Sequence, residues 1–149
     1  MRAVVQRVRR ASVEVEGELV GAIGRGLVAF VGAAEDDGDP DLAYVVNKVV
    51  GLRVFPDEAG KMTRALSDIG GELLAISQFT VFGDVRRGLR PSFDGAMEPT
   101  LAERAYERFV AEARARGVRV ATGKFRAHML VSVENDGPVT ILIDSRRAF

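Results

Sequence analysis

The sequence predicts a single α+β domain, with a mostly antiparallel sheet curled toward a barrel and two packed helices. Most apolar residues fall in short segments that alternate with polar residues or end at glycine-containing turns, as is typical of strands. Only two segments place apolar residues at helical spacing. At 149 residues, without an internal repeat or a low-complexity linker, residues 1–149 fit one domain.

The N-terminal part is expected to form four strands and then a helix. The strands are predicted at residues 2–9, 12–16, 19–23 and 27–31. Asp39 is expected to cap the helix, with Pro40 as its first residue. The buried face of this helix would carry four apolar residues at helical spacing: Leu42, Val45, Val46 and Val49.

The middle of the chain is expected to hold one buried strand, at residues 72–78, between two loop-rich segments at 53–71 and 83–99. A loop of about 17 residues in a compact domain is usually functional or mobile. The second loop therefore marks a region where a site is expected.

A second helix should follow, because Thr100 to Glu103 has the pattern of a capping box. It should end near Arg116, since Gly117 is a common residue just past a helix. Its inner face would hold Leu101, Ala105, Tyr106, Phe109 and Ala113. The last strands are predicted at residues 118–122, 127–134 and 139–144.

The composition excludes several classes of function. There is no cysteine and a single histidine, which argues against a zinc site. The 21 basic and 21 acidic residues cancel, which argues against wrapping long nucleic acid but permits binding of a short RNA end. No apolar segment approaches the ~18 residues of a membrane span, and no signal peptide is recognisable, so we expect a cytoplasmic protein without a membrane partner.

Two short segments carry the candidate chemistry. Ser77-Gln78-Phe79-Thr80 follows a buried strand, a place where consecutive backbone N–H groups can face a developing negative charge. On the residues alone, Ser77 and Thr80 could instead cap the strand, with Phe79 in the core. Gly137-Pro138 lies between two strand-like segments, where an ordinary turn is the alternative.

The only histidine offers a different mechanism. His128 is predicted on the strand face shared with Leu130 and Ser132, and a serine, histidine and aspartate triad is possible on composition. No nucleophile-elbow motif accompanies it. A structural or exposed histidine is therefore the favoured interpretation.

Together with the opening residues Met1 to Val8, the two segments closely resemble the D-aminoacyl-tRNA deacylase family, and the similarity continues to Asp144-Ser145. The resemblance implies the same barrel-like fold. It also implies hydrolysis of the ester of D-aminoacyl-tRNA at the 3′ acceptor end, and of glycyl-tRNA mischarged on tRNA(Ala), without a cofactor or metal. It further implies a homodimer in which the Gly-Pro segment of one subunit enters the pocket of the other.

The resemblance also assigns roles to residues. The backbone around Ser77, Gln78, Phe79 and Thr80 would line the pocket and stabilise the oxyanion, with the 2′-hydroxyl of the RNA assisting and no essential side-chain nucleophile. A covalent role for Thr80 is the alternative. Gly137 and Pro138 would reject L-amino acids, and Arg7 would steady them and could bind their carbonyls. Phe125 would stack on the terminal adenine.

Three other functions stay open on the sequence. The chain could be a related editing enzyme that removes a mischarged L-amino acid. It could be a dimer that binds RNA without catalysis, which its neutral charge makes less favourable. It could be a serine esterase that uses His128.

Overall fold

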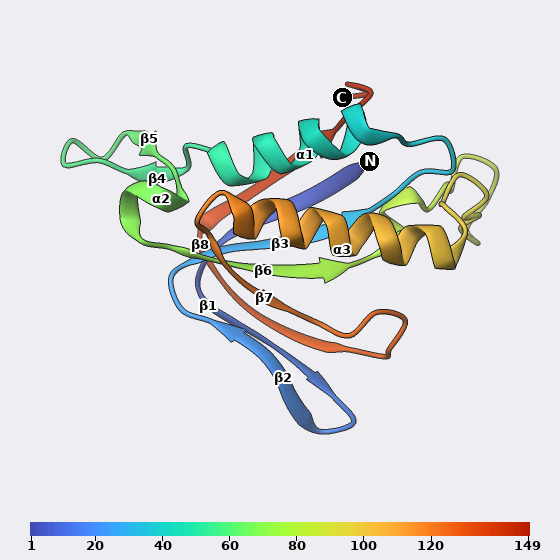
Figure 1. Cartoon of the computed structure of the whole chain (residues 1–149), viewed down its shortest axis with the longest axis horizontal. Coiled ribbons are helices and arrows are strands. Elements are labelled where there is room, and N and C mark those ends of the chain that lie inside the picture. Colours follow the sequence, from blue (N-terminus) through green and yellow to red (C-terminus); the bar gives the residue numbers. More distant parts are fainter.

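A computed structural model describes residues 1–149 and shows two helices packed on one face of a strongly curled sheet (Figure 1). The six-stranded sheet has the order β2-β1-β3-β6-β7, and β8 pairs with β1. Its strands are β1 (Arg2–Val15), β2 (Glu18–Ile23), β3 (Gly26–Gly32), β6 (Glu72–Ser77), β7 (Arg119–Thr122) and β8 (Leu130–Asp144). The predicted α+β fold class is confirmed.

The sheet is mixed and nearly closes on itself. β1 pairs antiparallel with β2, β3 and β8, whereas β3 with β6 and β6 with β7 are parallel. A Cβ atom built on Gly21 of β2 would lie 2.5 Å from the Thr122 carbonyl oxygen of β7, so only glycine permits this approach of the two outer strands. The curl toward a barrel follows from this contact.

Two predicted strand breaks are absent. Residues 2–16 form essentially one strand, and its register with β8 shifts between Gln6 and Arg10, so β1 bends without ending. Residues 139–144 and the later part of 127–134 likewise belong to one strand, β8, whereas residues 127–129 precede it. β1 and β8 pair with each other along most of their lengths, and this pairing keeps each strand continuous through the residues where a turn was predicted.

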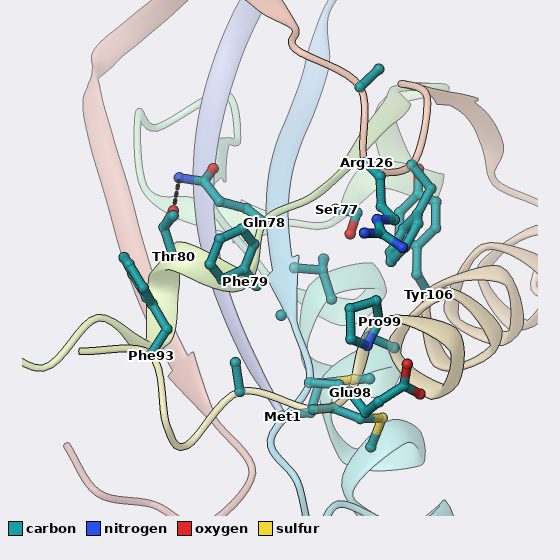
Figure 2. A pocket seen from close by; sticks show the side chains of 18 of the residues that line it. Met1, Ser77, Gln78, Phe79, Thr80, Phe93, Glu98, Pro99, Tyr106 and Arg126 are labelled. Atoms are coloured by element: carbon teal, nitrogen blue, oxygen red, sulfur yellow. Dashed lines mark hydrogen bonds between the residues drawn. The ribbon is translucent and has the colours of Figure 1, made fainter. Parts of the chain in front are cut away.

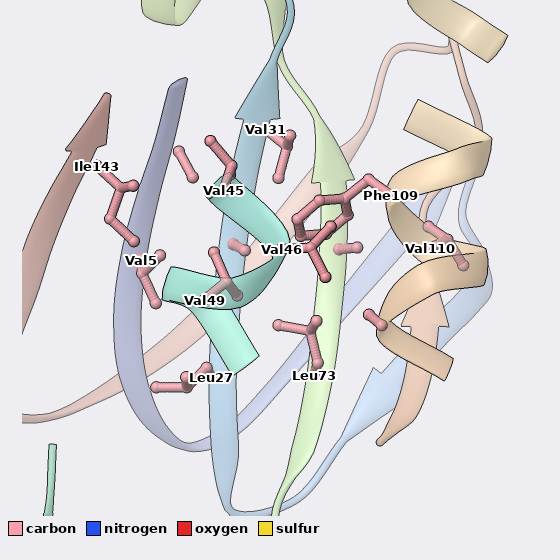
Figure 3. Packing of buried hydrophobic residues seen from close by; sticks show 14 of the residues in the cluster. Val5, Leu27, Val31, Val45, Val46, Val49, Leu73, Phe109, Val110 and Ile143 are labelled. Carbon is pink, nitrogen blue, oxygen red and sulfur yellow. The ribbon is translucent and has the colours of Figure 1, made fainter. Parts of the chain in front are cut away.

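The core lies on both faces of the central strands. Leu27 and Leu73 point toward the helices, whereas Val28 and Leu74 point into the curl of the sheet. Strands buried on both faces are continuous apolar segments, which explains why β3 and β6 show no alternation. Figure 3 shows the helix side of this core, where Val45 and Val46 of α1 and Phe109 of α3 cover Leu27, Val31 and Leu73.

Both main helices begin earlier than the sequence predicts, the first by one residue and the second by two. In α1 (Asp39–Gly51), Gly38 is the N-cap, and its N–H donates to the Asp41 carboxylate at 2.9 Å. The four predicted apolar residues of α1 are all buried. In α3 (Pro99–Ala115), Glu98 is the N-cap, so the predicted capping box at Thr100 is wrong.

The inner face of α3 also differs in one position. Leu101 is 51% exposed, because the first turn of the helix lies at the edge of a cavity, and Val110 takes a buried place instead. The helix ends at Ala115, close to the predicted end at Arg116. Gly117 follows with φ of +82°, the left-handed conformation that is common for a glycine just past a helix.

The two expected loop regions contain short elements. Residues 53–71 hold β4 (Phe55–Pro56), β5 (Met62–Arg64) and the short helix α2 (Leu66–Ile69). The 3₁₀ helix η1 (Phe79–Phe82) precedes the second loop. Within this loop, Asp84 and Ser92 form an isolated antiparallel β-bridge, and Ala96 forms another with Ala34. No helix is long and apolar enough to cross a membrane.

Candidate active site

A cavity of about 580 Å³ opens at the carboxyl ends of the parallel strands β3 and β6 (Figure 2). Its walls include the ends of these strands, η1, residues 93–97 of the following loop, the start of α3 and the turn at residues 125–129. Such a position, where strands stop and several loops converge, is a common place for ligand sites. Most of its lining residues are apolar.

All four residues of the Ser77 to Thr80 segment line this cavity. Gln78 extends the pairing of β6 with β3, since its N–H donates to the Val31 carbonyl at 2.8 Å. The chain then turns into η1, and the Gln78 side-chain amide donates to the Thr80 hydroxyl at 3.0 Å, as drawn in Figure 2. The first N–H groups of a helix have no intrahelical acceptor, so those of Phe79 and Thr80 are the donors that the segment offers to a ligand.

Gly32 allows this segment to approach β3. A Cβ atom on Gly32 would lie 2.7 Å from the Gln78 carbonyl oxygen and 2.6 Å from a methyl group of Val81. Any side chain at this position would push η1 outward. The backbone that carries the candidate oxyanion donors is therefore fixed by a glycine on the neighbouring strand.

Two aromatic pairs line the cavity on opposite sides. Phe79 is 55% exposed and meets Phe93 edge to face, with ring centroids 5.0 Å apart. Phe125 lies 6.2 Å from Tyr106, between centroids. The Tyr106 hydroxyl donates to the buried Ala75 carbonyl at 2.8 Å, and burial raises the pKa of Tyr106 to about 12. Tyr106 is thus a neutral, fixed support for Phe125.

Glu98 is the acidic side chain on the cavity wall. Its carboxylate accepts from the N–H groups of Thr100 at 2.9 Å and Leu101 at 3.2 Å. These backbone hydrogen bonds lower the pKa of Glu98, and the charge of Arg126 lowers it further. Glu98 is therefore ionised at neutral pH and is engaged in capping α3, which leaves it unsuited to be a general acid.

The Gly137-Pro138 segment bulges out of β8. In the pairing of β1 with β8, Gln6 faces Thr140 and Val8 faces Asn135, so residues 136–139 have no partner on β1. The Asn135 side chain closes the base of the bulge, accepting from the Val139 N–H at 2.9 Å and donating to the Val139 carbonyl at 3.2 Å. Gly137 and Pro138 are exposed, and the peptide bond between them is cis.

Arg7 holds the bulge from β1, although not by the contacts expected. Its Nε donates to the Asp136 carbonyl at 2.8 Å and its Nη1 donates to the Val54 carbonyl at 2.5 Å. The carbonyls of Gly137 and Pro138 do not bind it. Because a Cβ atom on Gly137 would lie 3.0 Å from Nη2 of Arg7, the arginine also packs against the bulge.

The predicted site residues thus fall into two groups. Ser77 to Thr80 and Phe125 line one cavity, whereas Arg7, Gly137 and Pro138 do not line it within the same chain. His128 is exposed, precedes β8 and does not line the cavity, so the serine esterase alternative lacks its base. No cluster of three or more His, Cys, Asp or Glu side chains is placed to hold a metal ion.

Sequence reasoning did not assign several wall residues of the cavity to the site, among them Phe93 and Glu98. Pro99 was the available signal for Glu98, because proline often follows an N-cap directly. Phe93 lies in the long loop, and no local pattern predicts its contact with Phe79.

The sequence model of the D-Tyr-tRNA(Tyr) deacylase family matches residues 4–144. The chain belongs to this family. A relative from Sorangium cellulosum (strain So ce56), named D-aminoacyl-tRNA deacylase, is 72% identical over 150 residues and both chains are covered completely. A second relative of that name, from Koribacter versatilis (strain Ellin345), is 54% identical over 149 residues, also with complete coverage of both.

Solved structures agree with the fold. A protein described as c-Myc DNA Unwinding Element Binding Protein is 43% identical, with a TM-score of 0.91 over 97% of this chain and 98% of its own. A probable eukaryotic D-amino acid tRNA deacylase shares the fold at a TM-score of 0.84 and 19% identity, covering 96% of this chain and 98% of its own. The barrel-like fold expected from the resemblance is confirmed.

Proposed function

We propose that the protein hydrolyses the ester bond of D-aminoacyl-tRNA and releases a free D-amino acid and tRNA. The observation that carries the proposal is family membership over residues 4–144, combined with a cavity that Ser77 to Thr80 line together. The aminoacyl ester at the 3′ acceptor end would enter this cavity. The reaction belongs to translation quality control, and we place it in the cytoplasm.

The chemistry relies on backbone donors. Water attacks the ester carbonyl, and the N–H groups of Phe79 and Thr80 stabilise the oxyanion until the ribose oxygen leaves with a proton. The vicinal 2′-hydroxyl of the terminal ribose assists in moving that proton. One good oxyanion donor accelerates such a step by about 10²–10³. The Thr80 hydroxyl accepts a hydrogen bond from Gln78, which suits a structural role better than a nucleophile.

Gly137 and Pro138 would provide the choice of chirality. Inserted into a pocket, their carbonyls would clash with the side chain of an L-amino acid, whereas a D side chain would point to open space. Glycine, without a side chain, would escape this rejection, so glycyl-tRNA mischarged on tRNA(Ala) would also be a substrate. Selection by exclusion predicts indifference to the type of side chain.

The exclusion would act between subunits of a homodimer. Gly137 and Pro138 are exposed and lie outside the cavity of their own chain, while Asn135 and Arg7 hold them in place. Leu142, on the same strand, is 56% exposed and offers apolar surface for a second copy. The Gly-Pro bulge of one subunit would therefore complete the pocket of its partner.

The direct test is to incubate purified protein with D-tyrosyl-tRNA(Tyr) and to measure the release of D-tyrosine. We expect multiple turnovers without added metal or cofactor. The absence of ester cleavage would refute the proposal. A preparation inactivated by heat corrects for spontaneous hydrolysis.

A second candidate function is nucleic-acid binding without hydrolysis. The observation that favours it is the description of the 43% identical solved structure as a DNA unwinding element binding protein. The zero net charge makes extensive binding of duplex phosphates unfavourable. Tight binding of tRNA or of DNA, together with an intact ester after incubation, would favour this candidate.

A further inference from the structure

Arg126 has an unusual backbone at the edge of the cavity. Its φ angle is +62°, in the left-handed region that a residue with a Cβ atom rarely adopts. It follows Phe125 in a tight turn, in which the Ala127 N–H donates to the Lys124 carbonyl at 3.2 Å. Of the three non-glycine residues with positive φ, Glu16, Arg126 and Arg147, only Arg126 lines the cavity.

The guanidinium of Arg126 has no partner within the chain. It forms no ion pair and no side-chain hydrogen bond, so none of its donors is satisfied by the protein. The carboxylate on the same wall, Glu98, is occupied by two N–H groups of α3. Figure 2 shows the Arg126 side chain on the Ser77 and Tyr106 side of the cavity, opposite Phe93. Its five N–H donors are free for a ligand.

The proposed function determines which anion can reach this place. If the ester carbonyl lies at Ser77 to Thr80 and the terminal base lies against Phe125, the chain of the RNA must leave past the turn that holds Phe125. The first anionic group along it is the phosphate that joins the terminal adenosine to the preceding nucleotide. Arg126 is adjacent to Phe125 in sequence, and a guanidinium binds phosphate oxygens with two parallel N–H donors.

We propose that Arg126 binds the phosphate on the 5′ side of the terminal adenosine and so strengthens the binding of the acceptor end at the mouth of the cavity. This inference rests on the proposed function. Arg126 is a substrate-binding residue and takes no part in ester cleavage. Lys124 is exposed and lines a separate shallow groove with Glu103 and Glu107, so it does not replace Arg126 inside the cavity.

The test combines Arg126→Gln with two substrates, D-tyrosyl-adenosine and a D-tyrosyl ester on the trinucleotide CCA, of which only the second carries the phosphate and the two preceding cytidines. We expect KM for the trinucleotide ester to rise about tenfold, as for loss of a charge-assisted contact. The kcat for both substrates, and KM for the adenosine ester, should stay within about twofold. Arg126→Lys should recover part of the loss, because it keeps the charge.

The controls separate binding from folding. Arg147→Gln removes an exposed arginine that also has a positive φ, of +55°, but lies outside the cavity, and it should leave both KM values unchanged. Arg126→Gly removes the side chain without any conflict with the left-handed backbone. If Arg126→Gln folds poorly, Arg126→Gly should still show the tenfold loss on the trinucleotide ester alone.

Two results would overturn the inference. One is an equal rise of KM for the adenosine ester and the trinucleotide ester, and the other is a fall of kcat on both without a change in KM. Competition by unacylated CCA and by adenosine against a fluorescent CCA probe measures binding without catalysis. If the wild-type protein cleaves neither ester, the proposed function fails. An Arg126-dependent preference for CCA over adenosine would still support the phosphate contact, and its absence would refute it.

Discussion

At the scale of single residues, Thr80 decides between two mechanisms. Its hydroxyl is held by the Gln78 side chain, whereas its N–H, at the start of η1, has no intrahelical acceptor. Thr80→Ala removes the hydroxyl and keeps the N–H. We therefore expect single-turnover cleavage of D-tyrosyl-tRNA to stay within about tenfold of the wild-type rate, with Ser77→Ala as the control for another hydroxyl on the same wall. A loss beyond about 10⁴-fold would mean that the hydroxyl is a nucleophile or base.

Phe125 carries a second prediction at this scale. Its ring packs on Tyr106 and faces the cavity, so Phe125→Leu keeps apolar volume but removes the stacking surface. Stacking of a base on an aromatic ring contributes about 1–3 kcal/mol. KM for D-aminoacyl-tRNA should rise roughly 5- to 100-fold with little change in kcat. An unchanged KM in a variant with normal thermal stability would refute the stacking role.

The residues that the sequence predicted are those whose function depends on the local backbone. Ser77 to Thr80 follow a buried strand, where backbone donors can face a ligand, and the family resemblance favoured this interpretation over a simple strand cap. Phe93 could not be found, because its place depends on a contact with η1. Pro99 offered a signal that Glu98 caps α3, but no local pattern places that cap on a cavity wall. The binding of Arg7 to the Asp136 carbonyl likewise depends on a bulge in β8 that is invisible in the sequence.

At the scale of elements, the contact of β3 with η1 supports the site. Gly32→Ala would place a methyl group 2.7 Å from the Gln78 carbonyl oxygen and force η1 outward. A displacement of about 1 Å can cost 10² in rate, so we expect kcat to fall by at least that factor. Gly51→Ala, at the end of α1 with no atom within 4 Å of the new Cβ, is the matched control and should be neutral or slightly stabilising. Equal kcat in the two variants would contradict this role of Gly32.

The packing of α3 on the sheet gives a prediction for stability at high pH. Burial raises the pKa of Tyr106 from 10.0 to about 12, so the folded state favours the neutral phenol. This stabilisation is complete below pH 10 and is lost as the pH rises toward 12. In Tyr106→Phe, Tm should fall less across this interval than in the wild-type protein. Parallel Tm curves for the two proteins would show that Tyr106 does not titrate this way.

The same substitution should cost little at neutral pH. The Ala75 carbonyl keeps a second donor, the Gly123 N–H at 3.3 Å, when the Tyr106 hydroxyl is removed. We expect a loss of about 1 kcal/mol in the free energy of unfolding, as for one buried hydrogen bond. Urea unfolding at pH 7 measures it.

Elements with strong internal periodicity were predictable from the sequence, and those set by neighbours were not. α1 shows all four buried residues at the expected positions. The break expected within residues 2–16 is absent because β8 pairs with β1 on both sides of it and holds β1 as one bent strand. The cap of α3 was misplaced because the carboxylate of Glu98 reaches the helix N-terminus better than Thr100 does.

At the scale of the whole molecule, the proposed exclusion of L-amino acids requires two subunits per functional pocket. A test is to mix Gly32→Ala, which has a damaged pocket and an intact bulge, with Pro138→Ala, which has the reverse. Pro138→Ala alone should cleave some L-aminoacyl-tRNA. Mixed dimers, formed by unfolding and refolding together, should regain selectivity for D substrates, because the intact bulge enters the intact pocket. Unchanged cleavage of L substrates after mixing would show that the bulge acts elsewhere.

Rejection of the L configuration at the α-carbon is the property on which the proposed function depends most. D-alanyl-, glycyl- and L-alanyl-tRNA(Ala) differ only in the substituents on that carbon, so initial rates of deacylation with the same enzyme preparation isolate the effect of chirality. We expect cleavage of the D-alanyl and glycyl esters and no enzymatic cleavage of the L-alanyl ester. Cleavage of the L-alanyl ester at a rate similar to that of the D-alanyl ester would contradict the proposed selection.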